Sequence, residues 1–78
     1  MTDAQRLAGA LNVLAKSPQF SYTQARATAR KDGGVDPEAT KARNSDFNPE
    51  VDGCETFVMK DGSVAQWMPG QQRYSAHS

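Results

Sequence analysis

The sequence predicts an α+β fold in which an N-terminal helical hairpin packs on a C-terminal β-hairpin or three-stranded antiparallel meander. Two observations lead to this prediction. Apolar residues recur at helical spacing in the first third of the chain, whereas two short apolar segments flank an Asp-Gly turn in the last third. The chain has 78 residues, fewer than the roughly 100–200 of an average domain, so we expect residues 1–78 to form one small domain.

The first helix is expected at about residues 3–16. Thr2 followed by Gln5 matches a capping box, in which each side chain accepts a hydrogen bond from the other residue's backbone N–H. One apolar face then carries three leucines, Leu7, Leu11 and Leu14. Pro18 ends the helix, because the residue before a proline is disfavoured in helical conformation.

A second helix is expected at about residues 22–31. Ser21 can cap its N-terminus, with Gln24 at the capping-box position. We expect it to stop at Gly33-Gly34, because glycine accepts the left-handed conformation that ends many helices. Its inner face is narrow and has only three residues to bury, Tyr22, Ala25 and Ala29. The two alanines are small and favour a close approach to the first helix.

Residues 32–53 form a polar, acidic connection. Asp36 followed by Pro37 predicts a third helix start, because proline is favoured at the first helical position. Few apolar residues follow, so we expect a short surface helix or a frayed turn. Residues 44–53 are expected to form a loop, with Phe47 and Val51 as its large apolar anchors.

The β-hairpin is expected at residues 54–68, around Asp61-Gly62. Its register has two alternatives, and a slip of one residue exchanges the two faces of a strand. A two-residue turn pairs Met59 with Val64. A three-residue loop pairs Met59 with Ser63 and gathers Phe57, Met59, Ala65 and Trp67 on one face. We favour the second register because it buries the aromatic residues together.

A third strand is expected at about residues 72–76, with Tyr74 facing inward. The whole core should be thin, since Leu, Val and Phe together number 11 of 78 residues. The predicted core is Leu7, Leu11, Leu14, Phe20, Ala25, Ala29, Phe57, Met59 and Trp67. A chain of this size leaves no room for a pocket of about 300 Å³ or more.

The net charge is zero, but the charges are unevenly distributed. Residues 1–31 hold five basic residues against one acid, whereas residues 32–62 hold three basic residues against eight acids. No apolar stretch approaches the 18 or more residues of a membrane helix, and no signal peptide is recognisable. With a single cysteine, the chain fits a reducing compartment, so we expect a location in the cytoplasm, or in that of a host cell, and no membrane partner.

Residues with catalytic or metal-binding chemistry are scarce. Cys54 and His77 are the only thiol–imidazole pair, and nothing places them within hydrogen-bond reach of each other. The acidic residues of 46–53 resemble a calcium loop, but Met59 stands where a bidentate Glu is needed. We therefore expect no enzyme activity, no catalytic residue, no metal and no cofactor.

Our first functional hypothesis is a small non-enzymatic binding protein that modulates or inhibits a larger cytoplasmic protein or ribonucleoprotein complex. Phage and mobile-element inhibitors, anti-CRISPR proteins among them, have chains of this size, which is an analogy of size class only. Exposed arginine, charge complementarity and aromatic side chains are typical of interfaces. The candidate partner-binding residues are Arg26, Arg30, Lys31, Glu50, Asp52, Glu55 and Tyr74.

The alternative is a nucleic-acid-binding regulator that uses the helix at 22–31. A helix-turn-helix arrangement would turn Arg26, Arg30 and Lys31 toward phosphates. The zero net charge disfavours this alternative, because nucleic-acid-binding domains are usually basic. A second copy of the chain is a further candidate partner.

Overall fold

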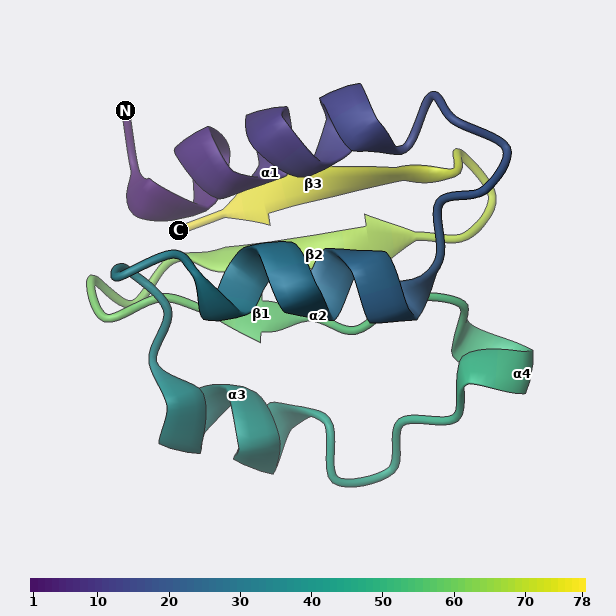
Figure 1. Ribbon diagram of the computed structural model, residues 1–78. Coiled ribbons are helices and arrows are strands. Elements are labelled where there is room, and N and C mark those ends of the chain that lie inside the picture. The colour runs from purple at the N-terminus through teal and green to yellow at the C-terminus, as the bar shows by residue number, and fades with distance from the viewer.

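The computed structural model describes residues 1–78 and shows four helices and a three-stranded antiparallel sheet (Figure 1). The helices are α1 (Asp3–Leu14), α2 (Tyr22–Arg30), α3 (Pro37–Arg43) and α4 (Pro49–Asp52), and the strands are β1 (Phe57–Val58), β2 (Val64–Met68) and β3 (Arg73–His77). The predicted α+β class is confirmed. None of the helices is both long enough and apolar enough to cross a membrane.

The strand order is β1-β2-β3, and the register is the one that the three-residue loop predicts. Phe57 pairs with Ala65, and the Met59 N–H donates to the Ser63 carbonyl at 2.9 Å. Gly62 takes a φ of +88°, a left-handed conformation that favours glycine. The expected third strand is present as β3, which pairs with β2 along its whole length.

The core lies between one face of the sheet and the helices α1 and α2 (Figure 1). It contains 12 buried residues: Ala4, Leu7, Ala8, Leu11, Ala25, Ala29, Cys54, Phe57, Met59, Ala65, Trp67 and Tyr74. Leu14 and Phe20, which were predicted to be core, are only half-buried. The helices α1 and α2 follow each other as expected, but α1 makes more of its contacts with β3 and β2 than with α2.

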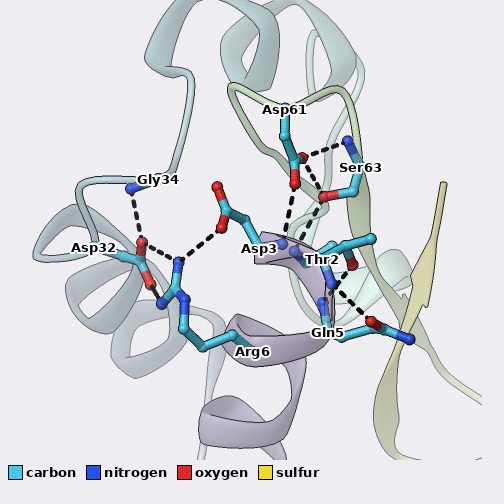
Figure 2. Close-up of polar contacts among 9 residues, drawn as sticks. Thr2, Asp3, Gln5, Arg6, Asp32, Gly34, Asp61 and Ser63 are labelled. Carbon is cyan, nitrogen blue, oxygen red and sulfur yellow. Dashed lines mark hydrogen bonds and ion pairs between the residues drawn. The ribbon is translucent and has the colours of Figure 1, made fainter.

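The N-terminus of α1 is fastened to the hairpin turn (Figure 2). The predicted capping box of Thr2 and Gln5 is present. The Asp61 carboxylate accepts from the Asp3 N–H at 3.0 Å, and the Ser63 hydroxyl accepts from the Ala4 N–H at 3.0 Å. The first N–H groups of a helix have no partner inside it. Here they donate to the capping-box residue Thr2 and to the side chains of the hairpin turn.

The end of α2 differs from the prediction. The helix ends at Arg30 with Lys31 as its C-cap at φ −82°, and no glycine of the Gly33-Gly34 pair takes a positive φ. The Asp32 carboxylate instead accepts from the Gly34 N–H at 2.8 Å and from the Arg6 guanidinium at 2.9 Å (Figure 2). This ion pair connects α1 to the segment after α2, so the chain turns without a left-handed residue.

Three further details differ from the prediction: a helix cap, a helix end and a short helix inside a predicted loop. Ser21 makes no side-chain cap, and α1 ends two residues earlier than predicted. The expected loop at 44–53 contains the short helix α4. Phe47 anchors this segment against the Tyr22 ring, with ring centroids 6.0 Å apart, whereas Val51 is 77% exposed and anchors nothing.

Side chains from α1, from α3 and from its C-cap residue Asn44 bond backbone groups at both edges of the sheet. At the β1 edge, the Thr40 hydroxyl donates to the Val58 carbonyl at 3.2 Å and accepts from the Val58 N–H at 3.0 Å. Asn44 makes the same pair of bonds with Thr56. At the β3 edge, the Asn12 amide bonds both backbone groups of Tyr74. These bonds occupy groups that would otherwise pair with a foreign strand.

Candidate functional site

An open groove of about 560 Å³ lies between the α1–α2 connection and α4. Its apolar and aromatic wall includes Phe20, Tyr22 and Val51, and Trp67 also lines it. We call it the Trp67 groove. The expectation that the chain has no room for such a volume is wrong. The segment that carries α4 has almost no apolar side chains to draw it onto the sheet, so a hollow remains beside Trp67.

A second hollow of about 430 Å³ adjoins the Trp67 groove. It is lined by residues that include Arg43, Asp46 and Phe47. The residues that line both hollows are Val51, Asp52, Cys54, Trp67 and Pro69. The segment around Val51 and Asp52 therefore borders open space on both sides, with the tryptophan common to the two hollows.

Local sequence explains why α4 forms. The Asn48 side chain accepts from the Glu50 N–H at 3.0 Å, and Pro49 occupies the first helical position. The Asp52 carboxylate closes the turn by accepting from the Asn48 N–H at 3.0 Å. This one-turn helix holds Val51, which is 77% exposed, between the exposed residues Glu50 and Asp52.

Gly53 sets the distance between this segment and the tryptophan. Its φ is +83°, and a Cβ added to it would lie 2.8 Å from Trp67 Nε1. Only glycine therefore lets the backbone cross the indole ring so closely. The indole N–H donates no hydrogen bond within the chain, and it is not sealed off, because no side-chain nitrogen or oxygen without a partner is fully buried. Trp67 as a whole is 8% exposed.

Arg26 and Glu55, two predicted partner-binding residues, bind each other. The Arg26 Nε donates to Glu55 Oε1 at 2.6 Å, and the Glu55 side chain is only 11% exposed. This hydrogen bond raises the pKa of the Arg26 guanidinium, which also lies 5.7 Å above the Tyr22 ring. The pair joins α2 to the segment before β1. The Glu55 carboxylate is thereby engaged inside the protein, whereas the Arg26 side chain, bound through Nε, is still 40% exposed.

Tyr74, another predicted partner-binding residue, is fully buried. Its hydroxyl donates to the Glu55 carbonyl at 2.8 Å, and its ring contacts those of Trp67 and Phe57. Burial raises the pKa of this phenol. The alternation of β3 turns Tyr74 into the core, as the strand pattern indicated, and this position removes it from any surface that a partner could reach.

The remaining four predicted residues are exposed but lie in two places. Glu50 and Asp52 both line the Trp67 groove. Arg30 and Lys31 stand at the C-terminal end of α2 and line neither hollow. The prediction missed Phe20, Tyr22 and Val51 as lining residues of the groove. The Asn48-Pro49 pair, which repeats the cap-and-proline pattern of Asp36-Pro37, was the signal that could have placed α4.

The thiol and the imidazole are far apart in the topology. Cys54 is buried, and burial raises the pKa of its thiol. It lines the groove beside Trp67, which pairs with Tyr74, whereas His77 pairs with Val64 at the other end of β3. No group of three or more His, Cys, Asp or Glu side chains is placed to hold a metal ion.

The fold and the groove define a small α+β protein with two helices on one face of a three-stranded sheet and an open groove over a tryptophan. A scan against protein-family models and searches of curated proteins and of solved structures found no match.

Proposed function

We propose that this protein is a small non-enzymatic binding protein that docks on a larger cytoplasmic protein or ribonucleoprotein complex and modulates or inhibits it. The observation that carries this proposal is the exposed Val51, which α4 holds between two carboxylates at the rim of the Trp67 groove. An exposed aliphatic side chain beside an aromatic hollow has the composition of an interface centre, and charged residues around it have that of a rim.

The size and the chemistry of the groove agree with this role. Its volume of about 560 Å³ suffices for a few side chains of a partner. Phe20, Tyr22 and Trp67 supply aromatic surface, which is enriched at interface hot spots. Because docking alone covers a patch of the partner, the proposed inhibition requires no chemistry from this chain.

The nucleic-acid alternative has less support. Arg30 and Lys31 are exposed, but the charge of Arg26 is compensated by Glu55. The helix α2 therefore offers two uncompensated cations at its end rather than a basic face. The co-purification experiment distinguishes this alternative, because it identifies bound nucleic acids as well as bound proteins.

The test is co-purification of the tagged protein from cells of its source, with the bound proteins and nucleic acids identified. Val51→Ser and Glu50→Lys change the rim of the groove, and both sites are exposed, so the fold tolerates them. Glu38→Lys makes the same charge change on α3, outside both hollows, and serves as the matched control.

The proposal expects one defined protein or ribonucleoprotein complex, retained by the wild type and by Glu38→Lys. The two rim variants should lose at least several-fold of it. Capture of nucleic acid alone would contradict the proposal, and so would a complex that all four proteins retain equally. If the double substitution Arg30→Glu and Lys31→Glu abolished capture of the complex and the rim variants did not, the interface would lie on α2 and not at the groove.

A further inference from the structure

The Trp67 groove combines aromatic rings with carboxylates. Phe20, Tyr22 and Trp67 line it on one side, and Glu50 and Asp52 of α4 line it on another. Lys16 is the one basic residue among the lining residues. The wall that α4 forms is therefore acidic. Both of its carboxylates are exposed, and neither forms an ion pair within the chain.

Such a combination suits the long cationic side chains. An arginine or lysine buries its aliphatic stem along apolar surface while its head group stays near water. A guanidinium is also attracted to the face of an aromatic ring, and it can make paired hydrogen bonds to a carboxylate. The molecule already contains one example of this arrangement, since Arg26 lies over the Tyr22 ring and binds Glu55.

Trp67, which lines the groove, carries a third group that can bind a ligand, its indole N–H. This N–H donates to no group of the chain, and it keeps access to solvent although Trp67 as a whole is only 8% exposed. Indole is a donor only, so its complement is an acceptor such as a backbone carbonyl. A protein segment supplies such carbonyls at regular intervals beside its side chains, whereas the phosphates of a nucleic acid would meet Glu50 and Asp52 with like charge.

We propose that the occupant of the Trp67 groove is an extended segment of the partner protein that carries an arginine or a lysine. Its cationic head lies between Glu50 and Asp52, its stem lies on the aromatic wall, and one of its backbone carbonyls accepts from Trp67 Nε1. This inference rests on the proposed function, because it names the chemistry of the partner that the function requires.

The test uses short capped peptides and the fluorescence of Trp67, the single tryptophan of the chain. The probe is a peptide of alternating leucine, arginine and glycine. A second peptide carries citrulline in place of arginine, which keeps the shape of the side chain and removes its charge. The protein variant is the double substitution Glu50→Gln and Asp52→Asn. The new amide at 52 still accepts from the Asn48 N–H, so α4 keeps its closing bond.

The arginine peptide should change the emission of Trp67 saturably. The citrulline peptide and the double variant should each weaken this binding about three- to tenfold, as expected for the loss of one or two exposed charge pairs. Glu38→Gln, a matched change outside the groove, should leave binding unchanged. Equal binding of the arginine and citrulline peptides would overturn the proposal, and so would no saturable change up to about 1 mM peptide.

The two proposals can fail separately. A complex whose capture depends on Glu50 and Val51, combined with no binding of the arginine peptide, would overturn the basic segment and leave the docking function standing. Saturable binding of the arginine peptide, combined with capture of nucleic acid alone, would support recognition of a basic segment and overturn docking on a protein complex.

Discussion

At the scale of single residues, Gly53 determines how closely the α4 segment approaches the tryptophan. A substitution to alanine forces a side chain into a φ of +83° and places its Cβ 2.8 Å from the indole nitrogen. We expect Gly53→Ala to lower the free energy of unfolding by about 1–3 kcal/mol, measured by urea denaturation. The indole N–H resonance should also shift, because the segment must move away from the ring.

Gly9 provides the control for this prediction. It lies inside α1, and an added Cβ would meet nothing within 4 Å. Gly9→Ala should raise the free energy of unfolding by about 0.5–1 kcal/mol, the difference between the two residues in a helix interior. A Gly53→Ala protein as stable as the wild type would show that the crossing over Trp67 is not as close as described.

The hydroxyl of Tyr74 is the second residue-scale feature. It donates to the Glu55 carbonyl inside the core. Tyr74→Phe keeps the ring and leaves that carbonyl without its donor, so we expect a loss of about 1–2 kcal/mol in the free energy of unfolding. Tyr22→Phe is the matched control, because Tyr22 is only half-buried. Equal losses in the two variants would contradict the role given to this bond.

At the scale of elements, two carboxylates fasten the start of α1 and make it sensitive to acid. Bonds from Ser63 and Asp3 lower the pKa of Asp61, and the Arg6 guanidinium lowers that of Asp32. A carboxylate with a lowered pKa in the folded state stabilises the fold above its unfolded pKa of about 3.9. That contribution is lost as the pH falls through the folded-state pKa.

The stability of the wild type should therefore fall between about pH 5 and pH 2, measured by urea denaturation at a series of pH values. The double substitution Asp32→Asn and Asp61→Asn should make the protein less stable at pH 7 and should flatten this decline. A double variant with the same acid sensitivity as the wild type would show that these two carboxylates do not carry it.

The edges of the sheet offer a further test at this scale. Thr40→Val keeps the shape of the side chain but removes both of its bonds to Val58. We expect a loss of about 1–3 kcal/mol in the free energy of unfolding, because the half-buried Val58 N–H loses its acceptor, whereas the Val58 carbonyl still accepts from the Asp36 N–H at 2.8 Å. Thr23→Val, at an exposed position of α2, should change stability by less than about 0.5 kcal/mol. A Thr40→Val protein that matches this control would contradict the edge-capping role.

Elements with strong local signals could be predicted from the sequence. The Thr2–Gln5 capping box, the Asp36-Pro37 helix start and the hairpin register at Met59 all depend on neighbouring residues. The end of α2 could not be predicted in the same way. It depends on Arg6, which is 26 positions away from Asp32 in the sequence and reaches it only in the folded chain.

The candidate site also combines residues that the sequence could predict with contacts that form only in the folded chain. Glu50 and Asp52 were chosen for their charge, and both line the groove. Glu55 was chosen for the same reason, but it is buried against Arg26. These two residues are 29 positions apart, and no local sequence pattern predicts their contact. The groove itself is tertiary, because its walls come from the α1–α2 connection, from α4 and from β2. The periodicity of apolar residues within one segment does not predict which segments pack side by side.

At the scale of the whole molecule, large apolar residues are scarce mainly in one part of the chain, the acidic connection at residues 32–53. The core is a single layer between the sheet and two helices, in which alanines let the helices approach closely. The acidic connection contributes no fully buried side chain through α3 or α4. It is attached by Thr40, Asn44 and Phe47, and at Gly53 its end crosses closely over the Trp67 ring. The open groove is thus a consequence of the uneven distribution of apolar residues.

The most direct test of the docking surface is a proton–nitrogen correlation spectrum of the labelled protein with and without the partner complex that it captures. The single indole N–H resonance and the backbone resonances of residues 50–54 should shift or broaden most. Those of the exposed residues of α2, such as Thr23 and Arg30, should change little. Changes confined to α2 or to the open face of the sheet, with an unperturbed Trp67 indole, would contradict the Trp67 groove as the docking surface.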